Sequence, residues 1–231
     1  MPFSKLGLST PLTQTLIDSK YDKPYPIQQQ AIPAVLKGKD VLGIAQTGSG
    51  KTAAYVLPIL SILRPRKDDK NRDVDALILV PTRELAGQVE EVFKEYNPSL
   101  RTPLNINAVF GGVSINPQMK GLFGVNILIA TPGRLLELVR ANSLSLSKVK
   151  HLVIDEADKM LNLGFKEEMD EIIKLLPRKR QNLLFSATLS DKVKEINQLV
   201  LTQPIVIKIK PREENLDLIQ QEAYFLSLIH I

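Results

Sequence analysis

Short runs of aliphatic residues recur along the chain and predict buried β-strands. They occupy residues 41–45, 76–80, 105–110, 125–130, 152–154, 183–185 and 205–209. Between several of these runs lie amphipathic segments that predict helices, at residues 84–96, 135–139 and 166–176. Strands that alternate with helices form parallel sheets covered on both faces. We therefore predict an α/β fold: an open, mostly parallel, twisted sheet with helices on both faces.

Two polar stretches, at residues 64–73 and 177–180, predict exposed loops, for which a solvated surface is favoured over a dedicated ligand contact. The chain has no repeat of fixed period and no low-complexity tract, which excludes a solenoid. It turns polar over residues 212–221 and then begins another apolar segment. We expect a folded unit over residues 31–210, an N-terminal segment over residues 1–30 packed on it, and at residues 211–231 the truncated start of a linker or second domain.

Composition narrows the class of protein. The 231 residues suffice for one large domain, and 44% hydrophobic with 24% charged residues is ordinary for a globular protein. The net charge of +5 favours acidic partners such as nucleic acid, without separating them from anionic lipid. The absence of cysteine excludes disulfides and fits a reducing compartment. Neither a signal peptide nor a membrane-spanning run is present, so we expect a cytoplasmic protein with no membrane contact.

Residues 45–52 follow a predicted strand and open a predicted helix, which is the context of a phosphate-binding loop. Glycines let the backbone turn its N–H groups toward phosphate oxygens, and the helix start adds positive charge. We expect Lys51 to reach the terminal phosphates of a nucleotide and the Thr52 hydroxyl to bind Mg²⁺. A glycine-rich turn without a ligand is the alternative. The expected nucleotide-binding residues here are Ala45, which stands where glycine is usual, Gln46, Thr47, Gly48, Ser49, Gly50, Lys51 and Thr52.

Three acidic residues come directly after the predicted strand at 152–154. They emerge at the carboxyl edge of that strand, where open α/β sheets bind ligands. We expect Asp155 to hold Mg²⁺ and Glu156 to orient and deprotonate the water that attacks the γ-phosphate, so that Lys51, Asp155 and Glu156 form the catalytic set. Asp158 is better placed for coupling than for chemistry. An acid that only caps the following helix is the alternative.

The residues Asp155, Glu156, Ala157 and Asp158 spell the motif that names the DEAD-box family of ATP-dependent RNA helicases, and the sequence resembles that family. Further matches follow in the family's order. Residues 45–52 resemble motif I, 81–88 motif Ia, 111–112 the GG element, 131–134 motif Ib and 186–188 motif III. The resemblance covers residues 3 to about 210. It implies the first of the family's two RecA-like P-loop domains.

Upstream, Tyr21 and residues 24–28 resemble the family's Q motif, although Tyr25 stands where threonine is more usual. The resemblance implies that the Gln28 amide bonds the adenine edge while Tyr21 stacks on the ring, which favours ATP over GTP. Phe3 matches the family's isolated upstream aromatic. Phe3 and Tyr21 are alternatively plain core residues.

The resemblance also implies contacts with the sugar–phosphate backbone of RNA, which carry no sequence specificity. The residues carried over are Pro81, Thr82, Arg83, Gly111, Gly112, Thr131, Gly133 and Arg134. Thr82 and Thr131 are alternatively helix N-caps. By the same resemblance Ser186 and Thr188 couple the nucleotide site to the RNA site, with Asp158 as the partner of Ser186; a serine hydroxyl satisfied by nearby backbone is the alternative.

The resemblance implies an ATP-dependent RNA helicase that uses ATP and Mg²⁺, of which this chain supplies the ATP-binding half. No counterpart of motifs IV, V or VI is found, so a second RecA-like domain would have to supply the arginine finger. Weak or no turnover is expected of the chain alone. Two other readings stay open: a module that binds nucleotide, RNA or a protein without turnover, and another P-loop enzyme such as a DNA translocase.

Overall fold

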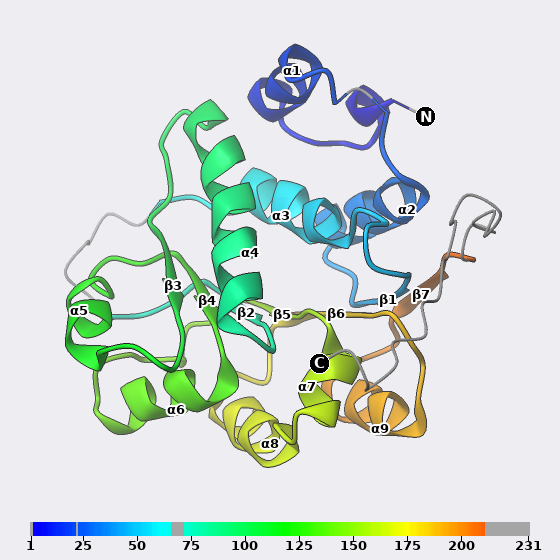
Figure 1. The fold of residues 1–231 in the computed structure, drawn as a ribbon. Coiled ribbons are helices and arrows are strands. Elements are labelled where there is room, and N and C mark those ends of the chain that lie inside the picture. The colour runs from blue at the N-terminus through cyan, green and yellow to red at the C-terminus, as the bar shows by residue number, and fades with distance from the viewer. Residues whose placement is uncertain (1, 22, 66–71, 211–231) are drawn as a thin grey trace, which may run out of the picture.

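The structure is a computed structural model that describes residues 2–21, 23–65 and 72–210. The segment expected at residues 211–231 lies outside the described residues, as does most of the predicted loop at 64–73. Within the described part, strands alternate with helices as the hydrophobic pattern predicts (Figure 1).

All described strands pair in one parallel sheet in the order β3-β4-β2-β5-β6-β1-β7. Each predicted run overlaps one strand, so the predicted sheet is confirmed. The strands are β1 (Val41–Ile44), β2 (Ala76–Leu79), β3 (Ile106–Val109), β4 (Ile127–Ala130), β5 (His151–Ile154), β6 (Gln181–Ser186) and β7 (Ile205–Lys208).

Strand β6 begins two residues before its predicted apolar run, with Gln181 and Asn182, and both polar residues are buried. Their side chains and backbone find partners in the segment that leads into β1. Gln181 Nε2 donates to the Lys39 carbonyl at 2.7 Å, and the Asn182 N–H donates to Asp40 Oδ1 at 2.8 Å. Buried polar groups that are hydrogen-bonded in this way are tolerated in a sheet, and an apolar run does not reveal them.

Helices cover both faces of the sheet (Figure 1). One face carries α2 (Pro26–Leu36), α3 (Lys51–Ile62) and α4 (Arg83–Tyr96), with α1 (Thr10–Asp18) packed beyond them. The other face carries α5 (Ile115–Lys120), α6 (Pro132–Arg140), α7 (Ala157–Asn162), α8 (Lys166–Leu175) and α9 (Asp191–Val200). The short helices η1 (Phe3–Lys5) and η2 (Asn97–Ser99) lie beside α1. The three predicted helices correspond to α4, α6 and α8.

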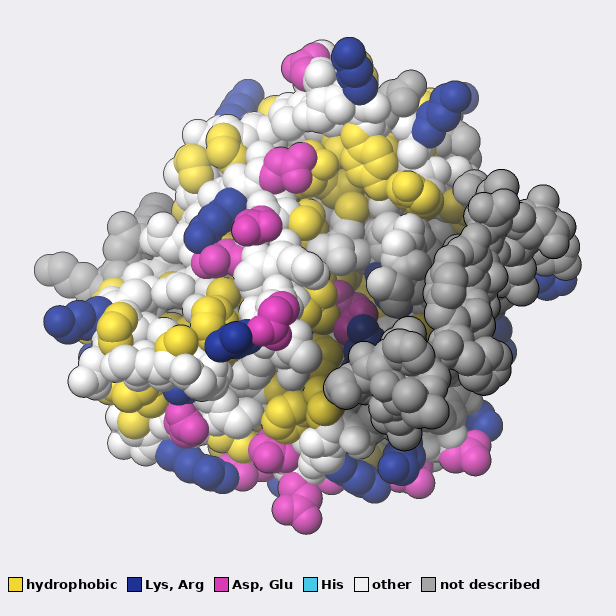
Figure 2. Space-filling view, viewed as in Figure 1, with side chains coloured by type: hydrophobic (Ala, Val, Ile, Leu, Met, Phe, Trp, Pro, Cys, Tyr) yellow, Lys and Arg dark blue, Asp and Glu magenta, His cyan; other side chains and the backbone are white. Residues whose placement is uncertain are grey.

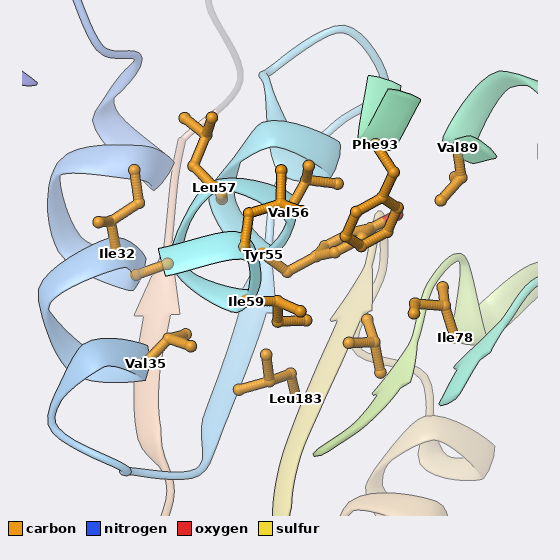
Figure 3. Packing of buried hydrophobic residues seen from close by; sticks show 14 of the residues in the cluster. Ile32, Val35, Tyr55, Val56, Leu57, Ile59, Ile78, Val89, Phe93 and Leu183 are labelled. Atoms are coloured by element: carbon orange, nitrogen blue, oxygen red, sulfur yellow. The ribbon is translucent and has the colours of Figure 1, made fainter. Parts of the chain in front are cut away.

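Alternate residues of each strand face opposite sides, which gives two apolar cores. Ile78 and Leu183 belong to the first core, whereas Leu77 and Leu184 belong to the second. Figure 3 shows the first core, with Ile32 from α2 and other residues from α3 and α4 above the strands. The segment at 177–180 is a loop as predicted.

No helix of the described residues is both long and apolar enough to span a lipid bilayer.

Candidate functional site

Five loops that carry predicted site residues open at one edge of the sheet. They follow β1, β2, β4, β5 and β6, and because all strands are parallel, the carboxyl ends of the strands meet at that edge. The edge therefore gathers the expected phosphate loop at 45–52, the acidic segment at 155–158 and the segments at 81–83, 131–134 and 186–188.

The loop between β1 and α3 has the backbone that phosphate binding requires. Gly48 and Gly50 adopt φ angles of 78° and 85°, in the left-handed region that favours glycine. Gly50 is the N-cap residue of α3, so the first N–H groups of that helix open toward the loop. A Cβ at Gly50 would collide with the Gln28 amide and lie 3.0 Å from the Tyr25 ring. Any side chain at Gly50 is thereby excluded.

Lys51 is held inside this loop. Its Nζ donates to the Ala45 carbonyl at 2.6 Å, and the residue is only 7% exposed. Burial lowers the pKa of Lys51, while the charges of Asp155 and Glu156 act in the opposite direction. A largely desolvated ammonium next to open backbone N–H groups is well suited to a polyphosphate.

Gln28 joins the start of α2 to the phosphate loop. The residue is fully buried, and its Nε2 donates to the Tyr21 hydroxyl at 2.6 Å and to the Gly50 carbonyl at 2.9 Å. Its Oε1 accepts the Tyr25 N–H at 3.0 Å. Phe3 is buried against Tyr21, with ring centroids 5.3 Å apart, so it lies in the core. Both Nε2 hydrogens of Gln28 are thus used within the protein, so an added adenine contact has to use the second lone pair of Oε1 or replace one of these bonds.

Asp155 lies buried at the end of β5, only 2% exposed. Its Oδ1 accepts the Glu156 N–H at 2.9 Å, and its Oδ2 accepts the Tyr55 hydroxyl at 2.8 Å. Burial raises the pKa of Asp155, and the bond from Tyr55 and the charge of Lys51 counteract it. Glu156 has a φ of 52° and pairs with Lys159 at 2.9 Å. A strained φ at a non-glycine residue is often found at functional sites.

Tyr55 was not among the predicted site residues. In sequence it reads as one more core position of α3, which is apolar over most of its length. The available signal was its place one helical turn after Lys51, since residues four apart share a helix face.

Asp158 of the acidic segment bonds to Thr188 in the loop after β6, and not to Ser186 as expected. Asp158 Oδ2 accepts both the Thr188 N–H at 3.0 Å and the Thr188 hydroxyl at 2.9 Å. The Ser186 Oγ is buried and has no hydrogen-bond partner among the described residues. The expected pairing of Asp158 with Ser186 is wrong in this structure, because the loop after β6 places Thr188 closer to α7.

The predicted RNA-contact residues lie in neighbouring loops. Thr82 caps α4 by accepting the Leu85 N–H at 3.2 Å, and Arg83 is exposed and pairs with Glu84 at 2.6 Å. Thr131 is the N-cap residue of α6 without a side-chain bond. A Cβ at Gly112 would lie 3.9 Å from Arg83 Nη1, so the loop after β3, which also holds Gly111, approaches the α4 start. Pro81 and Gly133 belong to the same two helix starts.

Arg134, in contrast, is 7% exposed and bonded within the protein. Its Nε donates to Glu137 at 2.8 Å and its Nη2 to the Val113 carbonyl at 2.8 Å. Glu137 is thus the anion that balances an arginine in the first turn of α6. The Arg134 Nη1 is buried without a partner among the described residues. Both N–H donors of Nη1 are thus unused among the described residues.

Charge on the visible surface is mixed. Figure 2 shows lysine and arginine side chains interspersed with aspartate and glutamate on this face. This face therefore has no broad basic surface that would attract a polyanion. If a polyanion binds, hydrogen-bond donors in the loops at the carboxyl edge of the sheet have to hold it.

The donors at the edge fit a magnesium ion. Thr52 and Asp155 both carry side-chain oxygen ligands, and Asp155 accepts a hydrogen bond from the Tyr55 hydroxyl. The described residues contain no group of three or more histidine, cysteine, aspartate or glutamate side chains able to hold a metal alone. Mg²⁺ usually takes one or two carboxylates and completes its shell with water and substrate phosphates, which agrees with this set.

Comparison with known proteins places the chain in a family. The DEAD/DEAH box helicase model matches residues 25–196. The ATP-dependent RNA helicase CshA of Limosilactobacillus reuteri is 44% identical over 222 residues, which are 96% of this chain and 44% of that protein. DeaD of Escherichia coli K12, also named an ATP-dependent RNA helicase, is 42% identical over 90% of this chain and 32% of its own length.

A solved structure supports the same family assignment. The crystal structure of a DEAD box protein from the hyperthermophile Methanococcus jannaschii superimposes with a TM-score of 0.83 at 34% identity, over 91% of this chain and 56% of that one. The chain thus spans less than half the length of the two curated relatives named above. The chain belongs to the DEAD/DEAH box helicase family.

Proposed function

We propose that this chain is the ATP-binding RecA-like domain of an ATP-dependent RNA helicase, and that it couples ATP hydrolysis to the local unwinding of short RNA duplexes. The observation that carries the proposal is the convergence of the phosphate loop, the acidic segment and the Gln28 anchor at one sheet edge. The relatives named above as ATP-dependent RNA helicases support it. Residues 1–30 act as the adenine-reading segment, 31–210 as the RecA-like domain and 211–231 as the start of a linker, and the protein works in the cytoplasm.

In this proposal the nucleotide lies along the loop between β1 and α3. The N–H groups at the α3 start and Lys51 hold its phosphates, while Gln28 and Tyr21 select adenine. Asp155 and Thr52 would hold Mg²⁺, which would supply positive charge beside the transferred phosphoryl group. Glu156 orients the attacking water and accepts its proton. Efficient turnover requires a second RecA-like domain, whose arginine finger contributes about 10³–10⁵ in rate in comparable enzymes.

RNA is held by its backbone at the neighbouring loops. Arg83 and the loop of Gly111 and Gly112 lie side by side, and Thr131, Gly133 and Arg134 begin α6. Asp158 and Thr188 then connect the nucleotide site to β6, because one carboxylate oxygen accepts two bonds from Thr188. Ser186, whose hydroxyl has no partner among the described residues, is the residue proposed to gain a partner on nucleotide binding.

The test is ATP turnover, with and without poly-uridine RNA, by the chain alone and by the chain joined to a second RecA-like domain of the same family. RNA-stimulated turnover only in the joined protein is the expected result. Binding of ATP without turnover in the joined protein would favour the pure binding module, and equal stimulation by DNA would favour a DNA translocase.

Two substitutions assign the roles. Lys51→Ala should weaken ATP binding about 100-fold, since it removes a charge-assisted contact with phosphate. Glu156→Gln should leave binding within about twofold and reduce turnover of the joined protein by at least about 100-fold, the scale of a lost general base. Glu167→Gln, on the exposed first turn of α8, is the matched control and should change neither. Unchanged turnover in Glu156→Gln would refute the role of Glu156.

A further inference from the structure

One buried hydroxyl, that of Tyr55, lies between the phosphate loop and the acidic segment. Tyr55 is fully buried in α3, and its ring packs against Phe185 of β6 with centroids 5.4 Å apart. Figure 3 shows the ring beneath Phe93, with Ile78 and Val89 on the same side. The side chain is thus fixed by packing from α3, α4 and β6, so its hydroxyl has a fixed position.

That hydroxyl contacts one of the two residues proposed to hold Mg²⁺: it donates to Asp155 Oδ2 at 2.8 Å. Thr52, the other, precedes Tyr55 by three residues and so shares its face of α3. Asp155 Oδ1 is already held by the Glu156 N–H at 2.9 Å. Both carboxylate oxygens of Asp155 therefore have one fixed donor each. The carboxylate plane is set before any ligand arrives.

The burial of Asp155 makes this donor important. A carboxylate that is only 2% exposed loses most of its hydration, so hydrogen bonds from the protein have to replace the lost water. A metal ligand must be ionised and correctly aimed, and groups that bond to a ligand commonly orient it. The Tyr55 hydroxyl is a neutral donor that favours the ionised carboxylate and fixes its direction, and it adds no charge that would repel the ion.

We propose that Tyr55 is a positioning residue that orients Asp155 for the Mg²⁺ that accompanies the nucleotide. The inference rests on the proposed function, since it assigns the ion to Asp155 and Thr52. Tyr55 itself touches neither nucleotide nor ion. Its effect passes through the direction of the Asp155 carboxylate.

The first experiment measures the Mg²⁺ concentration that half-restores binding of a fluorescent ADP to this chain. Tyr55→Phe keeps the ring against Phe185 and removes only the hydroxyl. The expected Mg²⁺ midpoint rises about tenfold, the low end of the change seen when a group that supports a metal ligand is removed. Binding in EDTA should be unchanged. Tyr96→Phe, which removes a hydroxyl from α4 away from the site, should leave the midpoint at the wild-type value.

Two further measurements separate positioning from packing. Tyr55→Leu also lacks the hydroxyl but packs differently, and it should show the same rise in the Mg²⁺ midpoint. In an Asp155→Asn background, Tyr55→Phe should raise the midpoint no further, because its effect passes through that carboxylate. A wild-type midpoint in either hydroxyl-free variant, or an additive effect in the double variant, overturns the inference. Failure of the wild-type chain to bind ADP at any Mg²⁺ concentration would instead refute the proposed function.

Discussion

Gly50 shows how tightly single residues define the nucleotide loop. Its φ of 85° is costly for any other residue, and its missing side chain leaves room for Gln28 and Tyr25. The carbonyl of the same residue accepts the Gln28 amide. The turn of the loop and the anchoring of α2 thus depend on one position.

We predict that Gly50→Ala destabilises the protein by about 1–3 kcal/mol, the cost of a left-handed non-glycine residue, and abolishes nucleotide binding. Urea unfolding and ADP titration check the two parts. Gly87→Ala is the matched control: it lies inside α4 with nothing within 4 Å of the new Cβ, and it should stabilise by about 0.5–1 kcal/mol. A Gly50→Ala protein as stable as wild type would contradict this explanation.

At the residue scale, the sequence predicts the placement of Lys51, Asp155 and Glu156 at the sheet edge, because each follows a strand in a known pattern. It does not predict the partner of Asp158, since Ser186 and Thr188 are both hydroxyl residues and only the loop geometry chooses between them. It also misses Tyr55, whose hydroxyl meets a carboxylate 100 positions later in the chain. Such contacts depend on packing, which local patterns do not contain.

At the scale of elements, helices α4 and α6, which both start at predicted RNA-contact residues, are capped differently. The Thr82 side chain accepts the Leu85 N–H at the start of α4, whereas Thr131 makes no side-chain bond at the start of α6. Threonine is a favourable N-cap only through such a bond. The helix starts therefore differ in how much they depend on their threonines.

Thr82→Ala should lower the free energy of unfolding by about 1 kcal/mol, the usual loss of a helix cap, while Thr131→Ala should lower it by much less. Denaturant titration of both variants measures the difference. If Thr131→Ala cost as much as Thr82→Ala, the loss of stability at an N-cap threonine would not depend on the side-chain bond seen at Thr82. RNA binding by both variants then reports any separate role in phosphate contact.

Strands were easier to predict than helices. Each of the seven aliphatic runs overlaps a strand of the described sheet, because the strands of a parallel sheet covered on both faces carry near-continuous apolar sequence. Helices α1, α2 and α9 were not predicted. Helix α2 carries Pro33 in its interior and buries the polar Gln28, so its sequence departs from an amphipathic pattern. Its place is fixed instead by packing along α3.

At the scale of the whole molecule, the proposed RNA binding has to come from local donors. The net charge is +5, yet acidic and basic side chains alternate over the face in Figure 2. Arg83 is exposed at the carboxyl edge, while Arg178 is exposed in the loop that precedes β6 at the opposite edge. The two arginines carry the same charge at opposite ends of the strands.

Arg83→Ala should weaken binding of single-stranded RNA in the joined protein alike for all sequences, and should reduce the slope of log affinity against log salt by about 0.7–1, as one lost phosphate contact does. Arg178→Ala, which removes one charge at the far edge, should leave that slope nearly unchanged. Equal effects of both substitutions would mean that net charge, not the loop at Arg83, determines binding. A sequence-dependent loss would count against backbone recognition.

The order of the strands affects how the protein folds while the ribosome synthesises it. In the described sheet, strand β1, which leads into the nucleotide loop, pairs with β6 and β7. The earlier of these, β6, begins about 140 residues after β1. At a synthesis rate of about 5–20 residues per second, β6 is therefore made roughly 7–28 s after β1. The nucleotide loop is then among the last parts to acquire its final shape. Binding of ATP by a nascent chain would therefore report that the domain has been completed.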